Sequence, residues 1–114
     1  MTELSRVGLL AALPGELLLK LAGRMQREEV GPGAPIVTEG DAGDRFYVVL
    51  NGLLSVTQAE RGLRGILKPG DYFGEVALAM DMPRTASVSP MTKVTLASCD
   101  RETFDEFIRP LFSD

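Results

Sequence analysis

The chain has 114 residues and a formal net charge of −4, with 45% hydrophobic and 25% charged side chains, which is the composition of one soluble globular domain. No apolar run approaches the ~20 residues of a membrane-spanning helix, and the acidic charge balance argues against a nucleic-acid partner. The chain has no histidine and one cysteine, Cys99, which excludes the usual zinc sites, a His-ligated haem, an internal disulfide, and Ser-His or Cys-His catalysis.

Two short helices are predicted at the amino end, over residues 5–13 and 14–25. Pro14 suits a first helical position, and apolar side chains recur after it at helical spacing. We expect residues 1–30 to form this helical part of the domain. The first residues lack the basic start, long apolar centre and small-residue cleavage pattern of a secretory signal, so we expect a cytoplasmic location.

A β-rich part is predicted after the helix-breaking segment 31–35. The six candidate strands are residues 35–38, 46–51, 53–58, 63–68, 85–89 and 93–97, with turn residues between them. Asn51-Gly52 is the sharpest turn signal, because both residue types accept a positive φ and a type I′ turn matches the twist of paired strands. The spacing of these short strands predicts a barrel or sandwich over residues 34–98.

A last helix is predicted over residues 100–110, because Asp100 can cap its amino end. Its apolar side chains share one helical face: Phe104, Phe107, Ile108 and Leu111. The pair Arg109-Pro110 is expected to end or kink this helix, since a proline disfavours helical geometry at the preceding residue.

The segment 70–88 concentrates the residues that could bind an anion. Gly74 permits a close backbone approach, and a short helix after it would point free N–H groups at the anion. Arg84 could donate a charge-assisted hydrogen bond to a phosphate, while Glu75, which has the wrong sign for that task, could accept one from a sugar hydroxyl. A nucleotide or a sugar phosphate carries both a phosphate and a sugar hydroxyl. The alternative stays open that Glu75 and Arg84 form a surface ion pair beside a plain connection.

The same segment resembles the phosphate-binding cassette of cyclic nucleotide-binding domains. The family pattern Phe-Gly-Glu-x-Ala-Leu, then Pro-Arg-x-Ala-x-Val, is matched by Phe73, Gly74, Glu75, Ala77, Leu78, Pro83, Arg84, Ala86 and Val88. Residues 39–44 and 46–52 resemble the early strand–turn–strand pattern of the family. The resemblance covers nearly the whole chain. It implies a mainly β fold with flanking helices: an eight-stranded jelly-roll β-barrel, amino-terminal helices and a carboxy-terminal hinge helix.

The resemblance implies a regulatory module that binds a cyclic purine nucleotide, cAMP or cGMP, and needs no cofactor. Glu75 would accept a hydrogen bond from the ribose 2′-hydroxyl, and Arg84 would pair with the exocyclic phosphate oxygens. The remaining phosphate contacts would come from the backbone N–H groups of Gly74, Ala77 and Ala86. Thr85 lies where the family can contact the purine, but it does not decide between cAMP and cGMP.

The resemblance also implies a route from the nucleotide to a partner. Leu78 resembles the cassette leucine that touches the hinge helix, so Phe104 or Phe107 is its expected neighbour. That contact could relay occupancy of the loop to an attached or separate effector domain. The family's further helix over the base is not seen before the chain stops at Asp114. This indicates either a piece of a longer chain or a natural minimal domain with the base exposed.

Two other functions remain open at this point. The first is a degenerate domain of the same fold that serves as a structural or protein-interaction unit and binds no nucleotide; the intact Glu75 and Arg84 argue against it. The second is an enzyme that acts on a phosphodiester. No metal cluster or general-base pair accompanies the arginine, so we expect a binding module and not an enzyme.

Overall fold

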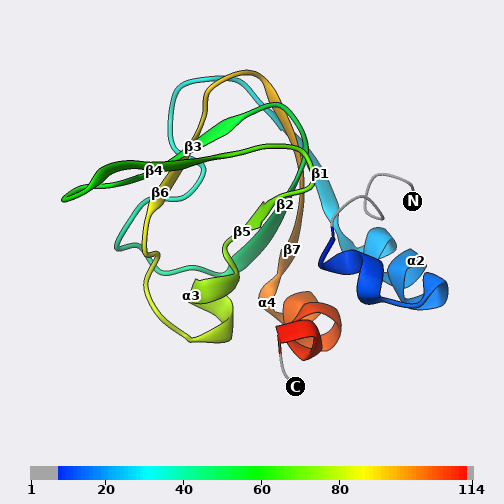
Figure 1. Ribbon diagram of the computed structural model, residues 1–114. Coiled ribbons are helices and arrows are strands. Elements are labelled where there is room, and N and C mark those ends of the chain that lie inside the picture. The colour runs from blue at the N-terminus through cyan, green and yellow to red at the C-terminus, as the bar shows by residue number, and fades with distance from the viewer. Residues whose placement is uncertain (1–7, 113–114) are drawn as a thin grey trace.

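The computed structural model describes residues 8–112 and shows two β-sheets with helices gathered at one end (Figure 1). The strands are β1 (Gln26–Val30), β2 (Arg45–Asn51), β3 (Leu54–Gln58), β4 (Gly62–Leu67), β5 (Tyr72–Phe73), β6 (Ser87–Pro90) and β7 (Val94–Asp100). The helices are η1 (Leu10–Ala12), α2 (Gly15–Arg24), α3 (Glu75–Ala79), α4 (Arg101–Thr103), η2 (Phe104–Ile108) and η3 (Arg109–Phe112).

The strands form a four-stranded sheet in the order β1-β7-β2-β5 and a three-stranded sheet in the order β4-β3-β6, with every pairing antiparallel. The predicted mainly β fold with flanking helices is confirmed. The predicted eight-stranded barrel is not confirmed, because the described residues form seven strands in two separate sheets. The expected strand at 35–38 makes only one isolated bridge, Val37 to Val88. Pro35 lacks the backbone N–H that a ladder would use before the bridge, and the positive φ of Gly40 turns the chain away after it.

Residues 26–30, placed by the prediction in the helical part of the domain, form strand β1. This strand pairs with β7 along its whole length, from Gln26 opposite Ser98 to Val30 opposite Val94. Its sequence carries three charges in a row, which hides the alternation of a half-buried strand. Charged side chains are tolerated here because β1 is an edge strand, and they discourage pairing with another chain.

The turn at Asn51-Gly52 does not close a hairpin. β2 pairs with β7 and β5, whereas β3 pairs with β4 and β6, so this turn carries the chain from one sheet to the other. Only Gly52 has a positive φ, of 89°, which a type I′ turn would require at both central residues. Glycine is still required at position 52, because a Cβ there would lie 2.4 Å from the carbonyl oxygen of Lys93.

The helical segments follow the prediction in part. Helix α2 agrees with the expected 14–25, whereas the expected 5–13 is reduced in the described part to η1, and its first residues lie outside that part. Asp100 caps the last helix as predicted, since its Oδ1 accepts a hydrogen bond of 2.9 Å from the Thr103 N–H. The α-helical turn stops at Thr103, earlier than predicted, and continues as the π-helical η2 and the 3₁₀-helical η3. Within residues 8–112, no helix is long and apolar enough to cross a membrane.

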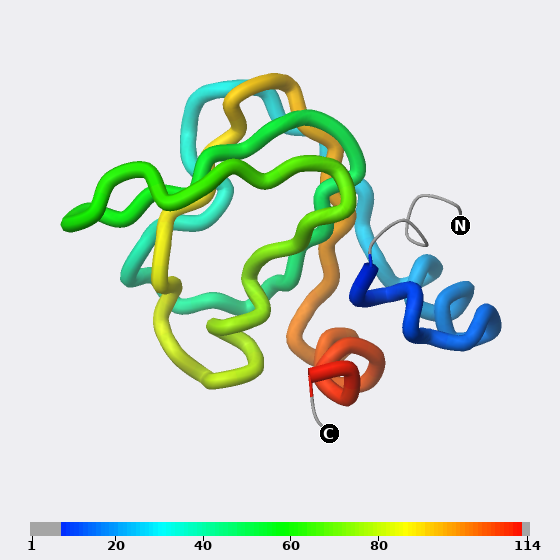
Figure 2. The backbone as a smooth tube through the Cα atoms, in the orientation of Figure 1, coloured from blue at the N-terminus to red at the C-terminus, as the bar shows by residue number. Residues whose placement is uncertain are grey.

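Two buried clusters hold the fold together, one on each face of β2. Tyr47 and Val49 point between the two sheets, where they join Phe73. Phe46 and Val48 point to the other face, where the amino-terminal and carboxy-terminal helices cover them and lie at the same end of the molecule (Figure 2). Because β2 is buried on both faces, its sequence reads as a continuous apolar run.

Candidate functional site

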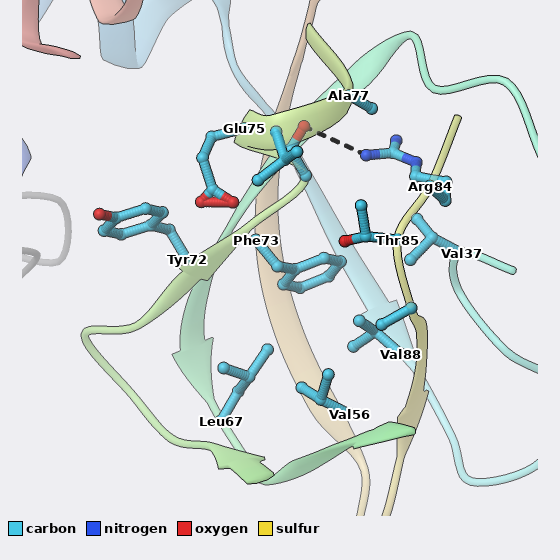
Figure 3. Close-up of a pocket in the computed structure, with 13 residues that line it drawn as sticks. Val37, Val56, Leu67, Tyr72, Phe73, Glu75, Ala77, Arg84, Thr85 and Val88 are labelled. Carbon is cyan, nitrogen blue, oxygen red and sulfur yellow. Dashed lines mark hydrogen bonds between the residues drawn. The ribbon is translucent and has the colours of Figure 1, made fainter. Parts of the chain in front are cut away.

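A pocket of about 220 Å³ opens beside α3, between the cassette segment and the three-stranded sheet (Figure 3). All six residues predicted as binding residues line it: Gly74, Glu75, Ala77, Arg84, Thr85 and Ala86. Its floor is apolar and comes from several strands and one loop: Val37, Val56, Leu67, Phe73 and Val88. A pocket with an apolar floor and a few convergent polar groups is the usual form of a small-molecule site.

Arg84 is buried, with 7% of its surface exposed, yet it has no carboxylate partner within the described residues. Its Nη1 donates to the Gly74 carbonyl at 3.2 Å and its Nη2 to the Arg45 carbonyl at 2.9 Å. Burial lowers the pKa of the Arg84 guanidinium, and the nearby Tyr47, Asp44 and Glu75 partly oppose that shift. The surface ion pair with Glu75 is therefore not formed, and the pocket presents a buried positive charge that an anion could neutralise.

Glu75 begins helix α3 and faces the pocket from the side opposite Arg84 (Figure 3). Burial raises the pKa of this carboxyl, although hydrogen bonds from the backbone N–H groups of Glu75 and Val76 and the charge of Arg84 lower it. The carboxylate lies beside Tyr72, whose own pKa is raised by burial and then by Glu75. An acceptor held in this place suits the hydroxyl of a neutral group, such as a sugar.

Two glycines allow the backbone to close around Arg84. Gly74 has a φ of 96°, and a Cβ there would lie 2.8 Å from the Arg45 carbonyl oxygen and 2.9 Å from Arg84 Nη1. Gly43 is tighter still, because its Cβ would lie 2.6 Å from Ala77 Cβ and 2.7 Å from Arg84 Cζ. Sequence reasoning noted Gly43 in the early family pattern but did not place it at the site.

The sequence did not predict the apolar floor of the pocket or its aromatic edge. Tyr72 lines the pocket and meets the Phe112 ring edge-on, with the centroids 6.0 Å apart. Phe73 stacks on Tyr47 at 4.8 Å, which fixes the strand that enters the cassette. The alternation of apolar and polar residues along a strand could indicate which side chains point inward. The sequence does not show which strands pair, and the pairing decides which of them contribute to the pocket.

The carboxy end of α3 is held by the terminal helices. Leu78 is fully buried in the same cluster as Phe104 and Phe107, in agreement with the expected contact. Arg109 donates to the Leu78 carbonyl at 2.8 Å and to the Ala79 carbonyl at 3.1 Å, and Arg101 donates to the Leu78 carbonyl at 3.4 Å. These arginines satisfy carbonyls that a short helix leaves without partners.

Cys99 behaves as a buried apolar residue. It is 1% exposed, and burial raises the pKa of its thiol to about 12, so the reactive thiolate does not form at neutral pH. Among residues 8–112, no group of three or more histidine, cysteine, aspartate or glutamate side chains could hold a metal ion.

The family model of the cyclic nucleotide-binding domain matches residues 27–110 of this chain. The chain belongs to this family. Among curated relatives of this cyclic nucleotide-binding domain, the cAMP-dependent protein kinase regulatory subunit of Yarrowia lipolytica is 44% identical over 93 residues, which cover 81% of this chain and 25% of that protein. The regulatory subunit of Dictyostelium discoideum is 32% identical over 115 residues, which cover 95% and 35%.

Solved structures show the same fold. The regulatory domain of Toxoplasma gondii protein kinase A, solved with cAMP, has a TM-score of 0.88 and 28% identity, and the match covers 96% of this chain and 43% of that one. The regulatory subunit of a cAMP-independent protein kinase A from Trypanosoma brucei has a TM-score of 0.91 and 25% identity, with coverage of 96% and 40%. The domain spans only 24% to 35% of the length of its curated relatives.

Proposed function

We propose that this domain is a regulatory module that binds a cyclic purine nucleotide, with cAMP as the first candidate. The observation that carries the proposal is the buried guanidinium of Arg84, which lies on the pocket with no carboxylate partner among the described residues. Two of its five N–H donors bond backbone carbonyls, so the others remain for a phosphate. Family membership and relatives named as cAMP-dependent kinase regulatory subunits support the same ligand.

The pocket suggests a division of tasks. Arg84 binds the cyclic phosphate, and Glu75 accepts a hydrogen bond from the ribose 2′-hydroxyl. The backbone N–H groups of three residues complete the phosphate contacts: Gly74, Ala77 and Ala86. The purine lies toward Thr85 and the apolar floor, where burial of its faces contributes binding energy without a further charge.

The regulated partner in this proposal is an attached or separate effector, such as a protein kinase catalytic subunit in the cytoplasm. Support comes from the relatives, which are named as regulatory subunits of a kinase. Leu78 and the arginines on the carbonyls of α3 connect the pocket to the terminal helices, through which occupancy reaches that partner. The domain itself binds and does not catalyse.

A second candidate ligand is a purine nucleoside without phosphate. A regulatory subunit from Trypanosoma cruzi, solved with bound guanosine, has 26% identity to this chain and a TM-score of 0.87. The same fold therefore carries ligands that do not need a phosphate-binding arginine. Arg84 is the residue that separates the two candidates.

Isothermal titration with cAMP, cGMP and guanosine tests the proposal. We expect Arg84→Leu to weaken cyclic nucleotide binding by at least ~2 kcal/mol, because it removes charge-assisted hydrogen bonds, and Glu75→Gln to cost less. Arg61→Leu, on an exposed turn away from the pocket, serves as the charge-matched control and keeps parental affinity. An absence of heat from both cyclic nucleotides at high micromolar concentration would refute the proposal. Equal affinity of the parent and Arg84→Leu would show that this pocket is not the site.

A further inference from the structure

Arg84 lines two pockets of the molecule. The first is the pocket described above, and the second has a volume of about 140 Å³ and is formed by residues of the segment 36–44, by β2 and by Arg84 itself. The polar residues that line the second pocket are Thr38, Asp41, Asp44, Tyr47 and Arg84. Because Arg84 belongs to both walls, a group in the second pocket can act on the residue that we propose to bind the phosphate.

Tyr47 carries an unpartnered hydroxyl on this second pocket. Its ring stacks on Phe73, with the centroids 4.8 Å apart, and only 8% of its surface is exposed. Phe73 belongs to the floor of the first pocket (Figure 3), whereas Tyr47 lines the second pocket and not the first. Within residues 8–112 the hydroxyl has no hydrogen-bond partner, although every fully buried side-chain nitrogen or oxygen has one. The hydroxyl is therefore not sealed in the core, and the accessible space beside it is the second pocket.

The charges around Tyr47 place its hydroxyl near the Arg84 guanidinium. Burial raises the pKa of Tyr47, Glu28 and Asp44 raise it further, and Arg84 and Arg45 lower it. The phenol is therefore neutral at about pH 7 and can both donate and accept a hydrogen bond. After burial itself, Tyr47 is the strongest influence on the pKa of Arg84. The two groups are thus electrostatic neighbours that no direct hydrogen bond joins.

The second pocket suits water that bridges these two groups. Its volume of about 140 Å³ exceeds the ~30 Å³ that one water molecule occupies in the liquid. An ordered water needs roughly two to four polar partners, and the pocket offers a phenol, a guanidinium and the carboxylates of Asp41 and Asp44. A water bridge is nearly as favourable in enthalpy as a direct hydrogen bond.

We propose that Tyr47 is a positioning residue for nucleotide binding: through water in the second pocket, its hydroxyl accepts a hydrogen bond from Arg84 and holds the guanidinium where it meets the phosphate. The carbonyls of Gly74 and Arg45 take one N–H each. The water takes a third, and the last two of the five N–H groups remain for a bidentate phosphate contact. This inference rests on the proposed function, since it names a support for the phosphate-binding residue.

The first test uses the ligand-free protein and needs no nucleotide. Tyr47→Phe removes the hydroxyl and keeps the ring that stacks on Phe73. In nitrogen NMR spectra of the arginine side chains, we expect rotation about the Arg84 Nε–Cζ bond to become about three- to tenfold faster, because one hydrogen bond is lost. Thr57→Val removes a hydroxyl that lines neither pocket and is the control. An unchanged rotation rate in Tyr47→Phe would overturn the inference.

The second test asks whether the hydroxyl acts on binding through Arg84. We expect Tyr47→Phe to weaken cAMP and cGMP about three- to tenfold in isothermal titration, and both by the same factor, because the phosphate is common to them. Arg84→Lys keeps the charge and removes the guanidinium. In the Arg84→Lys background, Tyr47→Phe should cost little further affinity, since a double-mutant cycle isolates the interaction between the two residues. An undiminished loss in that background would overturn the inference.

The outcomes separate this inference from the proposed function. A parent protein that binds no cyclic nucleotide removes the proposed function, and the rotation rate of Arg84 alone then decides whether Tyr47 holds the guanidinium. A parent that binds cAMP while Tyr47→Phe binds equally well refutes the role of Tyr47 and leaves the proposed function standing. Urea unfolding completes the comparison: lower stability of Tyr47→Phe at parental affinity would assign the hydroxyl to the fold and not to binding.

Discussion

Arg84 and Glu75 are opposite charges on one pocket that do not neutralise each other. Arg84 gives its hydrogen bonds to two backbone carbonyls, and Glu75 receives them from the first N–H groups of α3. Backbone groups hold each side chain in place, so the donors of Arg84 and the acceptor sites of Glu75 that are not used in these bonds face the pocket. A ligand with one anionic group and one hydroxyl group satisfies both residues, whereas a simple anion satisfies only one.

We expect Glu75 to lower the stability of the ligand-free domain at neutral pH. Burial raises its pKa in the folded state, so the folded state binds the proton more tightly than the unfolded state does. The stability that this proton supplies is fully present below the unfolded pKa and is lost as the pH rises through the folded pKa. We expect Glu75→Gln to be more stable than the parent at about pH 7, with no difference left at about pH 3.5.

Urea unfolding at a series of pH values measures this difference. Glu60→Gln, at an exposed position, is the matched control. Glu75→Gln should at the same time weaken the nucleotide, so that stability and binding move in opposite directions, as they do for residues kept for function. Lower stability of Glu75→Gln at neutral pH would contradict this account.

Among the elements, the loop between β1 and β2 supports the cassette residues that line the pocket. Gly43 packs directly on Ala77 and on the Arg84 guanidinium, and its carbonyl accepts a hydrogen bond of 3.3 Å from Arg101. The loop also bonds the backbone of Arg84 on both sides, through Gly40 and Asp41. The loop therefore holds the Arg84 backbone and guanidinium in place from outside the pocket.

Gly43→Ala tests the close packing of this loop. The added Cβ overlaps Ala77 and Arg84, so we expect a loss of about 1–3 kcal/mol in unfolding free energy and weaker cyclic nucleotide binding. Gly31→Ala is the control, because nothing lies within 4 Å of its Cβ and its φ is not positive. Chemical denaturation and titration with cAMP measure both effects. Equal behaviour of the two variants would mean that the loop moves aside freely.

Across the whole molecule, helix α3 connects the pocket to the terminal helices. Its first residues line the pocket, while Leu78 at its other end is buried against Phe104 and Phe107. Arg109 adds two hydrogen bonds at that end. We propose that occupancy of the pocket reaches the terminal helices through these contacts, and such a coupling between two sites is reciprocal.

Leu78→Ala is expected to weaken this connection. Loss of its buried side chain costs about 2–5 kcal/mol of unfolding free energy through lost burial and a cavity. Hydrogen exchange of residues 104–112 should slow on cAMP addition in the parent and much less in the variant. Leu19→Ala, 58% exposed on α2, is the control. If Leu78→Ala does not fold, Arg109→Gln tests the same link, and parental protection in Arg109→Gln would count against a role for its hydrogen bonds.

The cassette could be read from the sequence because its parts are close in the chain. The residues from Gly74 to Ala86 lie within a single segment, and their order alone brings a glycine turn, a carboxylate and an arginine to one place. The cap at Asp100 and helix α2 could be predicted for the same reason, since caps and helical spacing are local. The mainly β class followed from the run of short strands.

The sequence by itself therefore determined the segment that lines the pocket, the mainly β class and the helix cap at Asp100. Only the tertiary structure decided that β1 is a strand, that Asn51-Gly52 joins two sheets, and that Gly43 packs against Ala77 and Arg84. The physical reason is that these features depend on partners far along the chain. Strand β1 pairs with β7 at the other end of the chain, and packing across the whole fold, not local preference, selects such partners.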